Sequence, residues 1–112
     1  MSLADEPFVY VTTTGNKTGL PRTIEIWFTS WNGCIYILAE HGRAAKWVMN
    51  ILADARVQVK LGDRAFVATA RVLDETADAE AWKTARDRAE SKYGWGDGLP
   101  VEIRPDMPLD LG

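Results

Sequence analysis

Hydrophobic and polar residues alternate along several stretches of the chain, which is typical of β-strands that bury one face. Residues 57–61 show the alternation most clearly, because every second position is aliphatic. Similar patterns, rich in aromatic and β-branched residues, predict strands over residues 8–14, 22–30 and 64–73. Within residues 22–30, Trp27 lies on the face opposite to the isoleucines.

Turn signals separate these predicted strands. A run rich in glycine, asparagine and proline at 15–21 follows the first strand, and a Gly-Asp pair stands at 62–63. The Asn-Gly pair at 32–33 is the strongest short hairpin signal. It predicts that residues 34–39 pair antiparallel with the strand before them.

Two segments have a helical period instead. Apolar residues at positions 44, 47, 48, 51 and 52 form one stripe, which predicts a helix over 44–53. Alanines then recur every four residues from 77 to 89. Thr76 is the expected N-cap of this second helix and Gly94 its C-terminal stop. Residues 101–104 can add a last short strand.

These elements fit one domain over residues 1–112. The fold class is mainly β, either a β-barrel or a tightly rolled sheet that carries helices outside. The composition, 46% hydrophobic and 26% charged, is ordinary for a globular domain. Residues 1–7 and 105–112 are expected to be loose tails.

Charge and composition narrow the function classes. The net charge of −3 gives no general attraction to nucleic acid or to an anionic membrane surface. No apolar run approaches the ~20 residues of a membrane span, and the first residues do not match a signal peptide, so the expected location is the cytoplasm. Cys34 is the one cysteine and is expected to be a small buried strand residue. We find no metal-ligand spacing and no nucleophile motif.

The turn between the first two predicted strands is the first candidate site. Two glycines in residues 12–22 let the backbone turn and expose N–H groups, and its hydroxyls and amides can surround an anion. Lys17 and Arg22 add positive charge at its ends. The alternative is a polar hairpin with solvated charges. A nucleotide P-loop is excluded, because Asn16 separates Gly15 from Lys17.

Two other segments are candidates. Residues 39–43 lead into the first predicted helix, whose N-terminus offers free N–H groups to an anion. His41 lies here, although a lone histidine is more often a hydrogen-bonding surface residue than a catalyst. Trp27 is expected to line a ligand cleft or a subunit interface. Trp95 stands in a glycine-rich loop that could act as a lid.

One run of residues resembles a known family. The run Thr12-Thr13-Thr14-Gly15-x-Lys17-Thr18-Gly19-x-Pro21-Arg22 is similar to the signature of the deazaflavin-dependent nitroreductases. The similarity continues through Trp47-x-x-Asn50 and covers roughly residues 8–72. The chain departs from the family pattern at Asn16, where arginine is usual, and at Glu40 and His41, where serine and lysine are common.

The resemblance implies a split β-barrel of the FMN-binding type, related to pyridoxamine 5′-phosphate oxidases. It also implies an oxidoreductase that uses the reduced deazaflavin coenzyme F-420. Hydride would pass from the cofactor ring to quinone-like, nitroaromatic or enone substrates, while the protein supplies orientation and a dry pocket.

The resemblance further implies where this cofactor binds. Lys17, Thr18 and Arg22 would hold its phosphate and acidic tail, and residues 39–42 with Trp47 would lie along its ring or polyol chain. The complete set of predicted cofactor-binding residues is Thr14, Asn16, Lys17, Thr18, Gly19, Pro21, Arg22, Ala39, Glu40, His41, Gly42 and Trp47. Tyr93 is the nearest match to the catalytic tyrosine of the family.

Two alternatives to this function stay open at the sequence level. One is a flavoprotein of the same fold that binds FMN. The other is a non-catalytic carrier of a flavin, a heme or an apolar ligand. For the leading hypothesis, the expected partners are a small-molecule substrate and a second copy of the chain, because a barrel of this type must cover its apolar seam.

Overall fold

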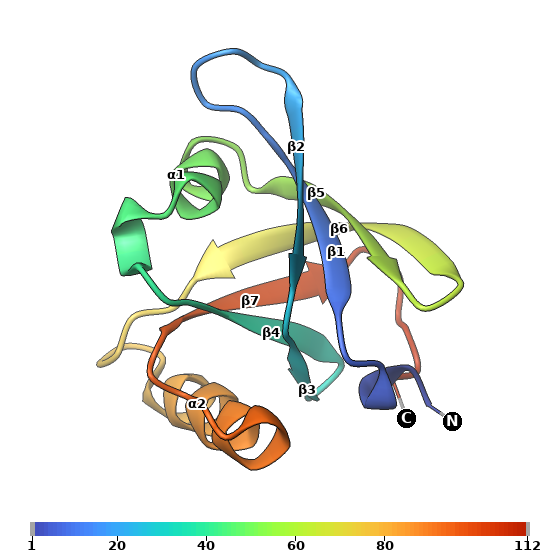
Figure 1. Ribbon diagram of the computed structural model, residues 1–112, viewed down its shortest axis with the longest axis vertical. Coiled ribbons are helices and arrows are strands. Elements are labelled where there is room, and N and C mark those ends of the chain that lie inside the picture. Colours follow the sequence, from blue (N-terminus) through green and yellow to red (C-terminus); the bar gives the residue numbers. More distant parts are fainter. Residues whose placement is uncertain (1, 112) are drawn as a thin grey trace.

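A curled antiparallel sheet of seven strands organises residues 2–111, the part of the chain that the structure describes. The structure is a computed structural model, shown in Figure 1. The strands are β1 (Val9–Thr14), β2 (Pro21–Ile26), β3 (Thr29–Trp31), β4 (Cys34–Ala39), β5 (Arg56–Leu61), β6 (Arg64–Val72) and β7 (Leu99–Pro105). The helices are α1 (Lys46–Ala53) and α2 (Ala79–Tyr93), with short 3-10 helices η1 (Leu3–Asp5) and η2 (Gly42–Ala44).

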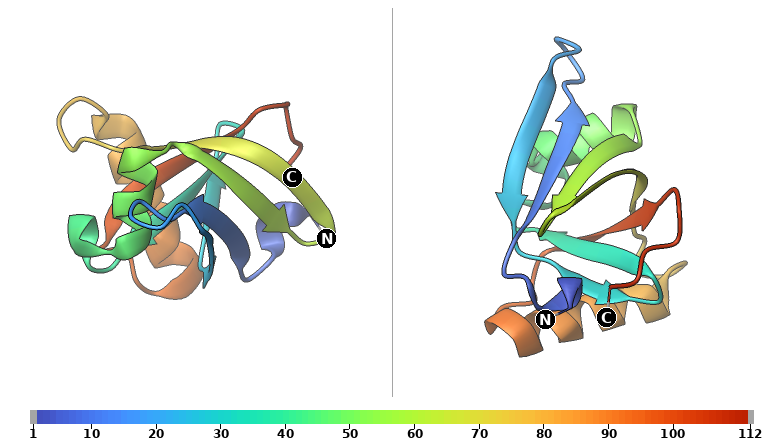
Figure 2. Two further views of the ribbon diagram at one scale, coloured as in Figure 1. Left: turned by 90° about the horizontal axis from the view of Figure 1, so that it is seen from above. Right: turned by 90° about the vertical axis from the view of Figure 1, so that its right-hand side faces the viewer.

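The strand order explains why the sheet curls. The order is β2-β1-β5-β6-β7-β4-β3, and all neighbouring strands are antiparallel. The two edge strands, β2 and β3, are joined by only two residues, Trp27 and Phe28. The sheet must therefore bend round until its edges meet at this connection, which we call the seam. The two views of Figure 2 show the resulting half-barrel, with α2 against the outer face of the sheet and α1 at one end of the curl.

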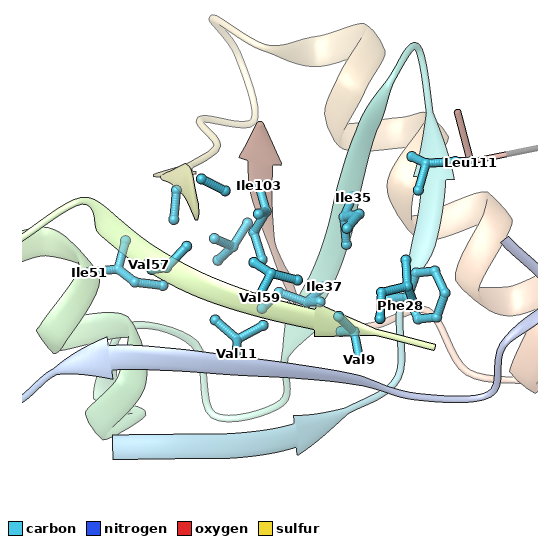
Figure 3. Close-up of a cluster of buried hydrophobic side chains, with 14 residues drawn as sticks. Val9, Val11, Phe28, Ile35, Ile37, Ile51, Val57, Val59, Ile103 and Leu111 are labelled. Atoms are coloured by element: carbon cyan, nitrogen blue, oxygen red, sulfur yellow. The ribbon is translucent and has the colours of Figure 1, made fainter. Parts of the chain in front are cut away.

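The alternating strands build the core inside this curl. Val57, Val59 and Leu61 of β5 are buried, while the residues between them are exposed. Val9 and Val11 of β1 and the isoleucines of β4 and β7 project into the same space, as Figure 3 shows. Burial of these aliphatic side chains is the main force that holds the curled sheet together. The barrel-like, mainly β architecture matches the sequence prediction.

The alanines that recur every four residues along α2 face a second, smaller core between this helix and the outer face of the sheet. Ala85 and Ala89 are buried there against Tyr36 and Leu38 of β4. Small side chains let the helix lie close to the strands. Cys34 is buried in the same layer as a free thiol, as predicted. Neither α-helix of residues 2–111 is long and apolar enough to cross a membrane.

Several predicted boundaries differ from the structure. The stretch 22–30 is not one strand, because the chain leaves the ladder at Trp27 to pass from one sheet edge to the other. The first helix begins at Lys46 rather than at residue 44, since η2 occupies the preceding residues. The predicted N-cap Thr76 is also wrong. The Asp74 carboxylate accepts hydrogen bonds from the backbone of residues 76 and 77 in a separate turn, so α2 starts only at Ala79.

The Asn-Gly hairpin was predicted correctly. Asn32 and Gly33 both have positive φ, at 54° and 76°, as a type I′ turn requires. The expected loose tails are wrong over the described residues. Leu111 is buried in the main core, and its carbonyl accepts a 2.8 Å hydrogen bond from the Ala4 backbone N–H. The two ends therefore close one side of the barrel together (Figure 1).

The loop after α2 is packed rather than free. Gly96 lies so close to α2 that a Cβ atom there would meet the Arg86 carbonyl oxygen at 2.3 Å. The Arg86 Nε donates a 2.7 Å hydrogen bond to the Gly96 carbonyl. Trp95 packs against the layer between α2 and the sheet. Trp95 therefore belongs to a packed wall and not to the mobile lid considered from the sequence.

Candidate active site

A pocket opens at the seam, where the two edges of the sheet meet. Its volume is about 620 Å³, within the ~300–1,000 Å³ usual for small-molecule sites. We call it the seam pocket. The sheet, the Trp27–Phe28 connection, α1 and α2 all contribute to its walls. Seven aromatic residues line it, namely Phe8, Trp27, Phe28, Tyr36, Trp47, Tyr93 and Trp95.

The end of α2 fixes one wall of the seam pocket. The rings of Trp27 and Tyr93 stack with their centroids 4.5 Å apart. The Tyr93 hydroxyl lies 3.2 Å from the Phe28 backbone N–H, which donates to it, and 2.8 Å from the Pro7 carbonyl oxygen. Burial raises the pKa of this phenol. The backbone thus holds the Tyr93 hydroxyl, and its ring faces the pocket.

Lys92 anchors the same wall. Its ammonium donates to the backbone carbonyls of Ala4, Glu6 and Phe28 at 2.8–3.1 Å, and it lies 3.9 Å from the centre of the Phe28 ring. Burial lowers the pKa of Lys92. These contacts tie the N-terminal segment and the seam to the end of α2. The position of Trp27 therefore depends on three separate parts of the chain.

A buried acid holds the part of the wall that β4 forms. The Tyr36 hydroxyl donates a 2.8 Å hydrogen bond to the carboxylate of Glu102, which is 6% exposed. Arg71 and Arg104 lie 3.6 Å and 3.4 Å from the same carboxylate, so its charge is balanced by two guanidinium groups. Burial, together with the hydrogen bond to Glu102, raises the pKa of Tyr36 far above its usual range.

Replacing Tyr36 with phenylalanine tests this wall. We expect Tyr36→Phe to lower the free energy of unfolding at neutral pH by ~1 kcal/mol, because Glu102 loses one donor and keeps its two arginines. The raised pKa also predicts a pH effect. Above pH 10 the unfolded chain releases the phenolic proton while the folded protein retains it, so stability falls as pH rises, by up to ~1.4 kcal/mol per pH unit. Urea titrations between pH 9 and 11 should show a shallower fall in Tyr36→Phe, and an equal fall would contradict this assignment.

The inner wall of the seam pocket contains one hydroxyl without a partner. Thr29 is 6% exposed and lines the pocket. Its Oγ1 is the one buried side-chain nitrogen or oxygen atom of residues 2–111 that forms no hydrogen bond.

The mouth of the seam pocket carries negative charge. Glu25, Glu40 and His41 line it and are exposed. Neither carboxylate has a hydrogen bond or an ion pair within the described part of the chain. An anionic group would be repelled from this mouth, whereas the aromatic interior suits a flat apolar ring.

The predicted anion site lies on the β1–β2 hairpin, beyond the seam pocket. Lys17, Thr18 and Arg22 are exposed and do not line the pocket. Figure 1 shows this hairpin projecting past the rest of the sheet, beside α1. Along the extended strand, Arg22 lies about 13 Å from Ile26 at the pocket, given ~3.3 Å per residue. A ligand that contacts both places must therefore be long.

Asn50 of α1 holds the hairpin in place. It is buried, its side-chain amide donates a 3.0 Å hydrogen bond to Thr13 Oγ1, and its carbonyl oxygen accepts a 2.9 Å bond from the Asn16 backbone N–H. One side chain thus ties β1, the turn and α1 together. Trp47, one turn earlier on α1, lines the seam pocket. This helix therefore links the pocket to the hairpin.

Most backbone N–H groups of the turn already have hydrogen-bond partners, which corrects one sequence expectation. The N–H groups of Gly15 and Gly19 bond to carbonyls of the same turn, and Leu20 donates to the Thr18 hydroxyl. With the Asn16 N–H bound by Asn50, four amides of the turn already have partners. An anion here would be held by the side chains of Lys17 and Arg22 rather than by a ring of backbone amides.

The structure therefore divides the predicted site residues into two groups. Glu40, His41, Trp47 and Tyr93 meet around the seam pocket. The second group lies on the hairpin and comprises Thr14, Asn16, Lys17, Thr18, Gly19, Pro21 and Arg22. Ala39 is buried at the end of β4, and Gly42 begins η2 with a positive φ of 59°. Trp27 lines the pocket, as one of its two sequence interpretations predicted.

Comparison with known proteins identifies the family. The model of the F420H(2)-dependent quinone reductase family matches residues 1–104. The chain belongs to this family. Membership confirms the predicted relationship to deazaflavin-dependent reductases, and with it a reductase that uses coenzyme F-420. It does not support the alternatives of an FMN flavoprotein or a non-catalytic carrier.

Solved structures agree with the family assignment. One, described as an F420-H2 dependent reductase (FDR-A), is 30% identical to this reductase, with a TM-score of 0.64 over 88% of this chain and 93% of that chain. Another, described as a domain-swapped dimer, is also 30% identical, with a TM-score of 0.63 over 88% and 80%. The heme storage protein HutZ from Vibrio cholerae shares the fold, with a TM-score of 0.76 at 15% identity over 97% and 88%. These similarities confirm the split β-barrel.

Proposed function

We propose that this reductase binds coenzyme F-420 with its ring in the seam pocket and its acidic tail along β2, and reduces quinone-like, nitroaromatic or enone compounds. The observation that carries the proposal is the course of β2. One end of this strand lines an aromatic pocket at Glu25 and Ile26, while the other end carries Arg22 and follows a turn that carries Lys17. A ligand with a flat ring and a long anionic tail matches this arrangement.

The seam pocket fits a deazaflavin ring. Its aromatic walls offer stacking surfaces, and about 620 Å³ leaves room for a second flat molecule beside the cofactor. In this arrangement Trp47 and Tyr93 contact the ring system. Ala39, Glu40, His41 and Gly42 follow the polyol chain, since they connect β4 to η2 at the pocket rim.

Charge determines the direction of the tail. The unpaired carboxylates of Glu25 and Glu40 disfavour a phosphate at the pocket mouth. Lys17 in the β1–β2 turn and Arg22 at the far end of β2 favour one, and Thr18 adds a hydroxyl. The remaining hairpin residues, Thr14, Asn16, Gly19 and Pro21, shape the turn that presents these groups.

The chemistry needs no nucleophile from the protein. When bound, the reduced deazaflavin supplies a hydride for an electron-poor carbon or nitro group. The chain contributes orientation through its aromatic walls and excludes water from the reacting rings. Tyr93 takes part by stacking on Trp27, because its hydroxyl is bound to the backbone.

A homodimer is the assembly we propose. Phe8 and Trp27 at the pocket mouth are 39% and 44% exposed, and β2 is a free sheet edge beside them. A second copy seated on this side would cover both. The 30% identical structure described as a domain-swapped dimer supports the idea. Light scattering should give twice the mass of the chain, and a monomer at micromolar concentration would contradict it. A cytoplasmic location stays a prediction.

Turnover tests the proposed activity. The purified chain is mixed with reduced F-420 and 1,4-naphthoquinone, a nitroaromatic or an enone, and oxidised F-420 is followed by its absorbance. We expect protein-dependent oxidation with at least one acceptor. Reduced FMN and NADPH serve as matched donors and should be inactive. No oxidation of reduced F-420 by any acceptor class would overturn the proposal.

A further inference from the structure

The seam pocket combines an aromatic interior with uncompensated negative charge at its mouth. Glu25 and Glu40 line it, are exposed, and form no hydrogen bond or ion pair within residues 2–111. Among the described residues, those that line the pocket include no lysine and no arginine. A molecule that enters therefore meets two carboxylates, and His41 is the one lining side chain that can become positive.

The course of β4 directs Glu40 toward the pocket. Side chains alternate along a strand, and Tyr36 and Leu38 lie on the face of β4 that packs toward α2. Both line the seam pocket, and Glu40 takes the next position of the same alternation. Because β4 ends at Ala39, this carboxylate stands just beyond the strand, at the rim.

Neighbouring cations do not neutralise this mouth. Arg43 and Lys46 follow Glu40 in the chain, but both are exposed, and neither lines the pocket or pairs with a carboxylate of the described residues. The Lys92 ammonium donates hydrogen bonds to three backbone carbonyls and does not line the pocket either. The two unpaired carboxylates therefore set the charge that an entering molecule meets.

A flat aromatic cation is the ligand that suits both features. Aromatic rings attract a cation over their faces, and nearby carboxylates attract it further, most strongly where walls exclude water. Trp27 stacks on Tyr93 through one ring face and remains 44% exposed, so it can present its other face to such a ligand. An anion of the same shape would be repelled by both carboxylates.

We infer that this pocket selects flat aromatic cations, such as N-alkylated quinolinium or acridinium rings, over anions of the same shape, and that Glu40 is a specificity-determining residue. The inference rests on the proposed function for the hydride donor. A hydride added to the electron-poor ring carbon forms a C–H bond, and the π electron pair of the C=N⁺ group moves to nitrogen. The acceptor becomes neutral, reduced F-420 is oxidised by two electrons, and the proton that it also loses passes to solvent.

Three ligands of nearly equal shape test the charge preference without cofactor. 1-Methylquinolinium is a cation, 1-methylnaphthalene is neutral and 1-naphthoate is an anion. Calorimetry measures their affinities for wild type and Glu40→Gln. We expect wild type to bind the cation at least tenfold more tightly than the anion. Glu40→Gln should bind the cation several-fold more weakly, the anion more tightly and the hydrocarbon unchanged. Raising the salt concentration should reduce the preference of wild type.

Glu80→Gln is the matched control. Glu80 is exposed in the first turn of α2, about 20 Å along the helix from Tyr93 at 1.5 Å per residue, and does not line the pocket. Its removal should leave all three affinities unchanged. Glu40 has no partner to lose, so Glu40→Gln should melt at the temperature of wild type, and a cation affinity that falls with intact folding supports the inference.

Turnover separates this inference from the proposed function. With reduced F-420 as donor, 10-methylacridinium should be reduced in a protein-dependent reaction, and kcat/KM should fall in Glu40→Gln but not in Glu80→Gln. Equal binding of the cation and the anion by wild type, undetectable binding of all three ligands, or equal effects of Glu40→Gln on all three would each overturn the inference. If the charge preference is present but no acceptor oxidises reduced F-420, the proposed function fails instead.

Discussion

Replacing both Lys17 and Arg22 with alanine is expected to weaken the binding of coenzyme F-420 by about a hundredfold or more. Each cation would make charge-assisted hydrogen bonds to the phosphate and acidic tail, worth ~1.5–3 kcal/mol apiece, and ~1.4 kcal/mol corresponds to a tenfold change in affinity. Both side chains are exposed, so the single variants should stay near tenfold. Fluorescence titration of F-420 measures the effect, which should shrink as salt is raised.

Two controls make this result specific. Lys60→Ala removes an exposed cation from β5, at the other end of the β1 ladder, and should leave affinity unchanged. A deazaflavin that lacks the acidic tail should bind the double variant and wild type equally well. If the double variant binds intact F-420 as tightly as wild type, the hairpin does not hold the tail.

The second large effect is expected at Asn50. Asn50→Leu keeps the number and branching of the side-chain heavy atoms but removes both hydrogen bonds that join α1 to β1 and the turn. Because Asn50 is buried, we expect a loss of ~1–3 kcal/mol in the free energy of unfolding. F-420 should also bind several-fold more weakly, since the hairpin loses its fixed position over α1. Urea unfolding and fluorescence titration measure the two effects.

Asn16 provides a matched control for Asn50. Its backbone N–H makes the bond to Asn50, while its side chain is exposed. Asn16→Ala should therefore keep both stability and the hairpin position. Hydrogen exchange of the Asn16 amide should accelerate in Asn50→Leu and not in Asn16→Ala. Normal stability and slow exchange in Asn50→Leu would show that the hairpin is held by other contacts.

Local patterns predicted most of the strands because each follows from nearby residues. The alternation in β5 and the Asn-Gly pair before β4 are local signals, and both are correct. The break at Trp27 is different in origin. It exists because β2 and β3 occupy opposite edges of the curled sheet, a fact of topology that the residues of 22–30 do not show. The N-terminus of α2 was missed because Asp74 forms a competing turn with the residues before it.

The site was predictable only in part, for a similar reason. Glu40, His41, Trp47 and Tyr93 could be named from motif and position, but the pocket that joins them forms only when the sheet closes. The unpaired hydroxyl of Thr29 has no sequence signal, since it arises only when the wall of the pocket packs. The sequence correctly placed Lys17 and Arg22 at the predicted anion-binding turn. It did not show that backbone N–H groups of this turn already donate hydrogen bonds to Asn50 and to the turn itself.

The five tryptophans allow a direct test of the whole account. Trp27, Trp47 and Trp95 line the seam pocket, while Trp31 and Trp82 do not. Nuclear magnetic resonance resolves the indole N–H signal of each residue during a titration with F-420. We predict that the signals of the three pocket tryptophans shift together with the backbone amides of Lys17 and Arg22, and that Trp31 and Trp82 stay in place. Shifts confined to Trp31 or Trp82, or unchanged amide signals of Lys17 and Arg22, would contradict a cofactor that spans the pocket and β2.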